Sequence, residues 1–139
     1  MVRLAHLLTG NNAAAQDLVH DAFIKVAARL TDTSRPVDSP QGYLRTAVVN
    51  QCMSWHRRKA VEARHATIPM EPIVLGPELD DTWDALTGLP PKRRTALVLR
   101  FYEDLSYADI ATVMGVRPGT VRSLIHRGLA SLRSELTHD

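Results

Sequence analysis

The C-terminal third of this 139-residue chain carries several helix-boundary signals close together. Ser106 followed by Asp109 is a capping box, in which polar side chains satisfy the unpaired N–H groups of a helix start. Gly115 suits the left-handed position that ends a helix, and Pro118 suits the first turn of the next one. Two helices joined by a turn of about three or four residues containing glycine are a helix-turn-helix. The sequence therefore predicts this motif, with its second helix reaching about Leu136.

The remaining periodic segments also follow the helical repeat, and none alternates with the strand repeat over a useful length. Another helix is expected from the prolines after Leu89 to about Tyr102. In the N-terminal half we expect a short helix ending at Gly10, a helix capped by Asn12, and a helix that begins after Ser39. The apolar side of the second of these is formed by Leu18, Val19, Ala22, Phe23, Val26 and Leu30. An all-α fold follows, with Phe23 assigned to its core.

Charge divides the chain into three parts. Residues 1–60 sum to +4, residues 61–89 to −5 and residues 90–139 to +3. The acidic part contains Pro69, Pro72 and Pro77 and has no sustained period, which is typical of a linker. We therefore expect two small helical modules, residues 1–60 and 89–139, joined by an acidic linker at residues 61–88.

Two basic modules in tandem indicate a polyanionic partner, although a net charge of +2 is equally compatible with an ordinary solvated surface. The outer side of the last predicted helix combines cations, hydrogen-bonding groups and small residues. Its members are Gly119, Arg122, Ser123, His126, Arg127 and Ala130. Such a mixture suits a helix that enters the major groove of DNA. The alternative is a solvated basic face on an ordinary three-helix bundle.

Several function classes are disfavoured. Cys52 is the single cysteine, so neither an internal disulfide nor a cysteine zinc site is expected. No apolar run approaches the roughly eighteen residues of a membrane span, and no signal-peptide pattern is seen, so a cytoplasmic protein is expected. An enzyme that uses some of the six histidines with nearby acids, such as His20 with Asp21, lacks any supporting motif. We therefore predict no catalysis, cofactor, metal or small-molecule substrate.

Longer motifs resemble a known family. Four segments of the C-terminal half resemble region four of the extracytoplasmic-function sigma factors, which belong to the sigma-70 family of bacterial RNA polymerase subunits. These segments are Leu89-Pro-Pro-Lys-Arg-Arg, Leu97-Val-Leu-Arg-Phe-Tyr, Leu105-Ser-Tyr-Ala-Asp-Ile-Ala-Thr-Val-Met-Gly and Gly119-Thr-Val-Arg-Ser-Leu-Ile-His-Arg. Four segments of the N-terminal half resemble region two of the same family. These are Leu7-Leu-Thr-Gly-Asn, Asp17-Leu-Val-His-Asp-Ala-Phe, Tyr43-Leu-Arg-Thr-Ala-Val-Val-Asn and Trp55-His-Arg-Arg. The matches occur in the family's order and cover nearly the whole chain.

The resemblance implies a factor that binds core RNA polymerase, carries it to a two-part promoter and helps to open the duplex. The residues implied at the upstream, minus-thirty-five element are Arg117, Thr120, Arg122, Ser123, His126 and Arg127. Those implied at the melted downstream, minus-ten element are Arg45, Asn50, Arg57 and Arg58, with the loop at residues 35–41. The polymerase-binding residues implied are Asp17, Leu18, His20 and Asp21.

Elementary chemistry is compatible with these roles. An amide such as that of Asn50 can read an unstacked base on its Watson–Crick edge, and nearby arginines can hold phosphates. Asp17 and Asp21 stand one helical turn apart and suit a basic partner, although a solvated helix face also explains them. An anti-sigma partner is a further possibility.

Two departures from the family pattern are visible. Members usually have a further stretch of sequence before the first matching segment, and without it we expect the first module to be of low stability in isolation. Arg117 replaces the small hydroxyl residue usual at the cap of the recognition helix. The competing interpretation is a stand-alone helix-turn-helix regulator that binds operator DNA as a dimer, which would leave residues 13–60 without a role.

Overall fold

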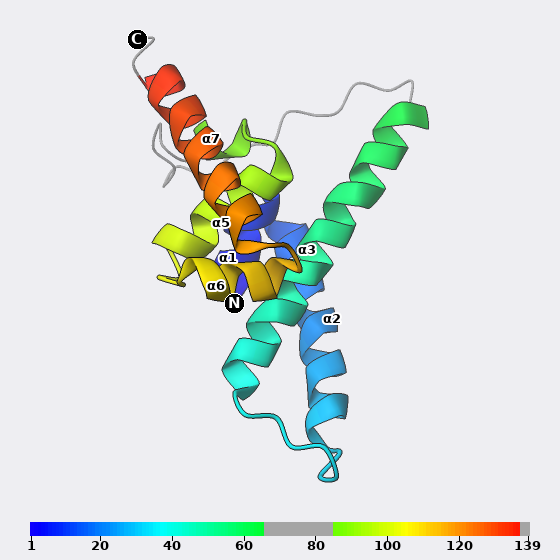
Figure 1. Ribbon diagram of the computed structural model, residues 1–139. Coiled ribbons are helices and arrows are strands. Elements are labelled where there is room, and N and C mark those ends of the chain that lie inside the picture. Colours follow the sequence, from blue (N-terminus) through cyan, green and yellow to red (C-terminus); the bar gives the residue numbers. More distant parts are fainter. Residues whose placement is uncertain (66–84, 137–139) are drawn as a thin grey trace. The chain divides into compact units, whose positions relative to one another are not determined.

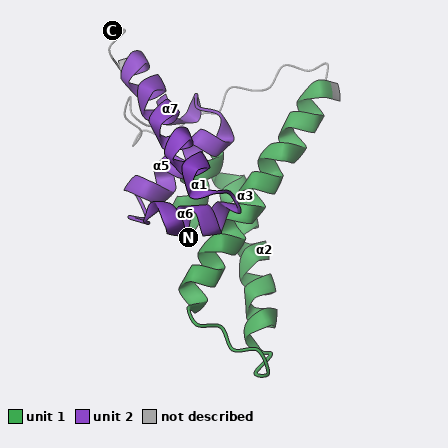
Figure 2. Cartoon of the chain, viewed as in Figure 1, with its two compact units in different colours: residues 1–69 green, residues 70–139 purple. Residues whose placement is uncertain are grey.

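Helices account for every regular element in the part of the chain that the computed structural model describes, residues 1–65 and 85–136. The chain divides into unit 1, Met1–Pro69, and unit 2, Met70–Asp139 (Figures 1 and 2). The predicted all-α fold is confirmed. The finer division at residues 60 and 89 stays a prediction, because most of the predicted acidic linker, including its three prolines, lies outside the described residues.

Unit 1 contains α1 (Val2–Thr9), α2 (Asn12–Leu30) and α3 (Pro40–His65), which pack against one another (Figure 1). α1 ends at Gly10, whose φ of 71° is the left-handed conformation expected there. The prediction that Asn12 caps α2 was wrong by one residue. Asn11 is the cap, since its extended backbone lets its side-chain oxygen accept a 3.0 Å hydrogen bond from the N–H of Ala14.

Buried aliphatic side chains from all three helices form the core of unit 1. They are Leu4, Ala5, Leu8, Ala15, Leu18, Val19, Ala22, Val26, Val48 and Val49, together with Cys52. The assignment of Phe23 to this core was wrong, because its side chain is 58% exposed. Phe23 lies at the edge of the apolar stripe, so its side chain points outward, whereas Ala22 and Val26 face inward. Burial also raises the pKa of the Cys52 thiol to about 12.

α3 continues further than the sequence pattern indicates. The Ser39 hydroxyl accepts a 3.1 Å hydrogen bond from the N–H of Gly42, as expected for the cap of this helix. At the other end the helix runs to His65, so residues 61–65, predicted as linker, are helical. An ion pair of 3.4 Å between Lys59 Nζ and Glu62 Oε2 lies across this last part.

Unit 2 contains α5 (Pro91–Phe101), α6 (Tyr107–Met114) and α7 (Pro118–Leu136). The Ser106 hydroxyl accepts a 3.1 Å hydrogen bond from the N–H of Asp109, and Gly115 adopts a φ of 68°. α6 and α7 pack against each other, and the predicted helix-turn-helix is confirmed. Its boundaries follow directly from residues suited to helix ends.

A glycine sets the contact between α5 and α7. A Cβ atom built on Gly128 would lie 2.8 Å from Cδ1 of Leu97 and 3.1 Å from its Cγ. Leu97 is buried in α5, so it has little room to withdraw. The absence of a side chain at residue 128 therefore allows the two helices to approach closely.

Candidate nucleic-acid interface

The predicted outer side of α7 is exposed from Gly119 to Ala130. Gly119, Arg122, Ser123, His126, Arg127 and Ala130 are all exposed, and we call this set the exposed strip. On the opposite side Val121 and Ile125 are buried against the rest of unit 2. The strip is thus a narrow face with two guanidinium groups, a hydroxyl and an imidazole, fixed on a packed helix. Such a face offers hydrogen-bond donors to base edges and phosphates.

The start of α7 is formed by the backbone of Arg117. Its carbonyl oxygen accepts hydrogen bonds from the N–H groups of Thr120, at 3.0 Å, and Val121, at 3.2 Å. The side chains of Arg117 and Thr120 are both exposed there. The position of a cation at a helix N-terminus, where backbone N–H groups point outward, favours a negatively charged partner.

Arg122 contacts an aromatic ring from the preceding helix. Its Cζ lies 5.9 Å from the centroid of the Tyr107 ring, and Cζ of Arg100 lies 5.0 Å from the same centroid. Nη1 of Arg100 also donates a 3.0 Å hydrogen bond to the carbonyl oxygen of Leu105. The sequence analysis missed Tyr107, because nothing in the spacing of an aromatic residue and two arginines shows that they meet.

Arg94 contributes to the positive charge of unit 2 but does not belong to its surface. Its side chain is buried, and its guanidinium donates to the carbonyl oxygens of Leu86, Thr87 and Leu89 at 2.8 to 3.0 Å. Burial lowers the pKa of this guanidinium. Arg94 therefore anchors the segment before α5, whose residues 85–87 are helical, and is not available to nucleic acid.

In unit 1 the residues implied at the downstream element lie on α3. Asn50, Arg57 and Arg58 are exposed, and Arg45 is half-buried. Asn50 and Arg57 are two helical turns apart and share one face. Nη2 of Arg57 donates a 2.9 Å hydrogen bond to the hydroxyl of Ser54, which lies between them. The helix thus presents an amide and a cation along one line.

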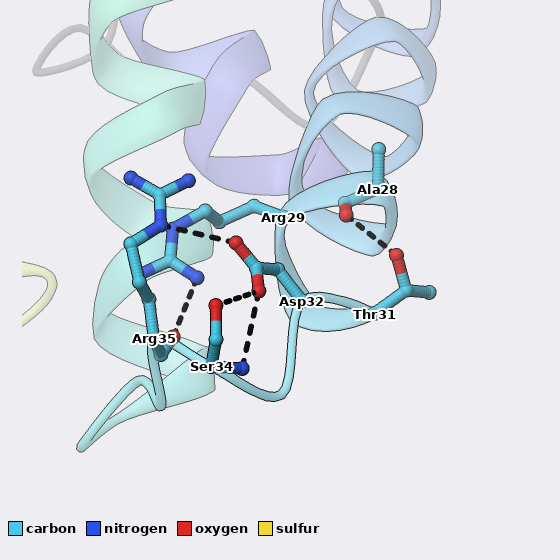
Figure 3. Close-up of polar contacts among 6 residues, drawn as sticks. All are labelled: Ala28, Arg29, Thr31, Asp32, Ser34 and Arg35. Carbon is cyan, nitrogen blue, oxygen red and sulfur yellow. Dashed lines mark hydrogen bonds and ion pairs between the residues drawn. The ribbon is translucent and has the colours of Figure 1, made fainter.

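The loop between α2 and α3 is held by a carboxylate (Figure 3). Asp32 accepts hydrogen bonds from the N–H of Ser34 at 3.1 Å, from its hydroxyl, and from Nε of Arg35 at 3.0 Å. Nη1 of Arg29 donates to the carbonyl oxygen of Arg35 at 2.6 Å. The hydrogen bond from the Ser34 hydroxyl, followed by those from Arg35 and the Ser34 N–H, lowers the pKa of Asp32. The first half of the loop is therefore ordered by its own side chains.

The outer face of α2 combines acids with apolar groups. Asp17, His20 and Asp21 are exposed, and Ile24 is 57% exposed. Leu18, implied as a polymerase contact, is only 4% exposed and belongs to the core, so in this fold it has no surface for a partner. Phe23 takes its place as an exposed apolar residue of α2.

Each described helix is too short or too polar to span a membrane. Within residues 1–65 and 85–136, no three histidine, cysteine or carboxylate side chains gather in a group that would hold a metal ion.

Comparisons with known proteins agree with the two units. Residues 1–61 match the family model of sigma-70 region 2, and residues 79–132 match that of sigma-70 region 4. The chain is 32% identical to RNA polymerase sigma-E factor of Streptomyces coelicolor, over 98% of this chain and 79% of that protein. It is also 32% identical to ECF RNA polymerase sigma factor SigM of Mycobacterium tuberculosis, over 94% of this chain and 68% of that protein.

A solved structure gives the same result. The sigma factor RpoE of Bartonella quintana, in complex with the anti-sigma factor NepR, matches with a TM-score of 0.76 and 26% identity. The match covers 99% of this chain and 90% of that one.

Proposed function

The chain belongs to the extracytoplasmic-function sigma factors of the sigma-70 family, and from this membership we propose which of its surfaces binds each partner. It binds core RNA polymerase and directs the initiation of transcription at specific promoters. The observation that carries this function is the match of regions two and four, in that order, on one chain. A regulator that acts without polymerase would leave the region two match unexplained.

The exposed strip of α7 is proposed to bind the upstream promoter element. Arg122 and Arg127 would donate to base edges or phosphates, and Ser123 and His126 would add adaptable hydrogen bonds. Arg117 and Thr120 would hold a phosphate at the start of the helix. Support comes from the exposure of all six side chains on a helix that is packed on its other face.

The face of α3 that carries Asn50 and Arg57 is proposed to bind the downstream element as a single strand. Asn50 would read an unstacked base, while Arg45, Arg57 and Arg58 would hold the phosphates. The loop at residues 35–41, which follows the Asp32 network, would contact the same strand. The exposure of Asn50 and Arg57 on one face supports this assignment.

The outer face of α2 is proposed to bind core polymerase. The carboxylates of Asp17 and Asp21 suit a basic partner, and exposed Phe23 and Ile24 suit an apolar one. Together these side chains fit a partner helix that has both basic and apolar residues. His20, exposed between the acids, would lie at the same contact.

The modules at residues 1–60 and 89–139 would act together. Joining them through the acidic segment that follows α3 would make the second promoter contact intramolecular and raise its effective concentration. The chain itself would supply no catalytic group, since polymerase performs the chemistry, and it would act in the cytoplasm, where polymerase is. An anti-sigma factor is a further proposed partner, as in the solved complex of the similar RpoE.

In-vitro transcription with core polymerase tests the function. A promoter is first selected from duplexes with randomised upstream and downstream blocks, using core polymerase with and without the chain. We expect enrichment of one two-part sequence, and accurate initiation from it, only when the chain is present. The absence of any enriched sequence would contradict the proposed function.

Two classes of variant then separate the surfaces. Arg122→Ala and Arg127→Ala are each expected to weaken binding to the upstream element by about 1 to 3 kcal/mol and to spare core binding. Asp21→Arg is expected to do the reverse. Equal loss of both activities in every variant would indicate unfolding, whereas loss of core binding by a folded Arg122→Ala variant would contradict the assignment of separate surfaces.

A further inference from the structure

The contact between Arg122 and Tyr107 joins two helices of unit 2. Tyr107 is the first residue of α6 and is half-buried, whereas Arg122 belongs to the exposed strip of α7. Cζ of Arg122 lies over the Tyr107 ring at 5.9 Å from its centroid. A guanidinium within about 6 Å of a tyrosine ring centroid is attracted by the negative face of the ring. The side chain of Arg122 is therefore tied to a helix other than its own.

The ring of Tyr107 has a second neighbour that fixes it in turn. Cζ of Arg100 lies over the ring at 5.0 Å, and Nη1 of Arg100 donates to the carbonyl oxygen of Leu105 at 3.0 Å. Because Leu105 directly precedes the capped start of α6, this arginine links the end of α5 to the same turn. The ring is thus supported from α5 while it contacts α7.

Ordering an arginine before it meets DNA has a physical benefit. A free arginine side chain occupies many rotamers, and part of this freedom is lost when its planar group pairs with a base. Two parallel hydrogen bonds to guanine require a defined orientation of that group. A side chain already restricted by a ring loses less freedom on binding.

We propose that Tyr107 is a positioning residue that orders Arg122 for reading the upstream promoter element. The proposal rests on the proposed function of the exposed strip. The ring face carries the effect, so the phenolic hydroxyl is not required. Tyr107→Phe retains wild-type affinity for the upstream element. Tyr107→Leu, which removes the ring, weakens it about two- to fivefold, as expected for an exposed cation–π contact.

A double-mutant cycle with the full chain bound to core polymerase tests the proposal. The probe is the upstream duplex selected by the wild-type holoenzyme, and its dissociation constant is measured for Tyr107→Leu, Arg122→Ala and the double variant. We expect Tyr107→Leu to weaken binding in the wild-type background and to have no further effect when Arg122 is absent. Tyr102→Leu, which alters another tyrosine of unit 2, is the matched control and leaves affinity unchanged.

The outcomes separate the two proposals. Equal weakening by Tyr107→Leu with and without Arg122 overturns the positioning role, and so does a loss caused by Tyr107→Phe. If Arg122→Ala leaves affinity unchanged, the assignment of Arg122 to DNA fails and the positioning role fails with it. If Tyr107→Leu fails to fold, Tyr107→Met takes its place, because methionine is apolar, unbranched and a good helix former.

A spectroscopic measurement on the folded chain is independent of DNA. The Nε–H resonance of Arg122 is expected to show a ring-current shift in the wild type and in Tyr107→Phe, and to lose it in the Leu or Met variant. Absence of the shift in the wild type overturns the proposal.

Discussion

The helices of both units begin or end at residues suited to those places, but unit 1 depends on two long helices, α2 and α3, that keep large apolar side chains exposed. Among the described residues, seven large hydrophobic side chains are exposed in unit 1 and three in unit 2. Those of unit 1 are Met1, Val2, Phe23, Ile24, Leu30, Tyr43 and Val61, and those of unit 2 are Phe101, Tyr102 and Leu129. Unit 2 is therefore closer to a self-contained DNA-binding module, and unit 1 retains surface suited to a large partner.

If unit 2 is self-contained, its stability should depend strongly on Arg94, the buried residue that holds the segment before α5. Arg94→Leu is expected to destabilise unit 2 by about 3 kcal/mol, because it removes the donor that binds the carbonyl oxygens of Leu86, Thr87 and Leu89, of which Leu86 keeps only the N–H of Leu89. Amide hydrogen exchange of α5 and α7, compared with that of α2, measures the effect. Lys92→Leu, at an exposed position of the same helix, is the control and should change little. Equal destabilisation of both units would break the comparison.

If the apolar surface of unit 1 serves a partner, it should be dispensable for folding. Phe23→Ser is expected to weaken core polymerase binding by about 2 kcal/mol. The free energy of unfolding of unit 1 should change by less than about 0.5 kcal/mol, as for other exposed sites. Binding is measured by titration of core polymerase with labelled chain.

Cys52 provides the check on folding for this variant. Its thiol is buried and has a pKa of about 12, so a thiol reagent at neutral pH reacts with it only when unit 1 opens. Labelling of Phe23→Ser should remain as slow as in the wild type. Leu18→Ser, a substitution in the core, should make it fast. Fast labelling of Phe23→Ser would place Phe23 among the stabilising residues.

The close approach of α5 and α7 gives a smaller effect. Gly128→Ala is expected to destabilise unit 2 by about 1 kcal/mol, since overpacking a well-filled contact outweighs the gain in helix propensity. Gly119→Ala on the same helix is the matched control, because a Cβ there meets nothing within 4 Å. The control should be neutral or slightly stabilising in thermal unfolding. Stabilisation by both substitutions would show that Leu97 yields without cost.

The smallest expected effect is local and depends on pH. The folded-state pKa of Asp32 lies below its unfolded value of about 3.9, so its hydrogen bonds are fully present above that pH and are lost as pH falls through the lower folded value. The amide resonance of Ser34 should follow this titration by NMR. Asp32→Asn should abolish it, and the core of unit 1 should not respond. A titration midpoint above about 3.9 would contradict the network.

The comparison also explains what the sequence predicts well. Ser106, Gly115 and Pro118 act through the backbone next to them, so their roles can be recognised without a tertiary structure. Two adjacent asparagines at residues 11 and 12 are equally good caps, and the choice of Asn11 depends on backbone geometry.

Other features depend on contacts between distant residues. Phe23 lies at the edge of the apolar stripe, and its exposure is decided by the packing of the neighbouring helices. The burial of Arg94 and the contact of Tyr107 with Arg122 likewise join separate segments of the chain. Residues 61–65 are too few to show a period of their own, which is why they were predicted as linker although they belong to α3.

The missing side chain at Gly128 has a geometric consequence for promoter reading. α7 lies closest to Leu97 at Gly128, and Arg122 lies roughly 9 Å from that point along the helix axis, at about 1.5 Å per residue. A tilt of about ten degrees at that point would move the Arg122 end by about 1.5 Å, half the length of a hydrogen bond. The absence of a side chain at residue 128 thus sets the angle at which α7 crosses α5, and bulk added there would displace the face proposed to bind DNA without changing any residue of that face.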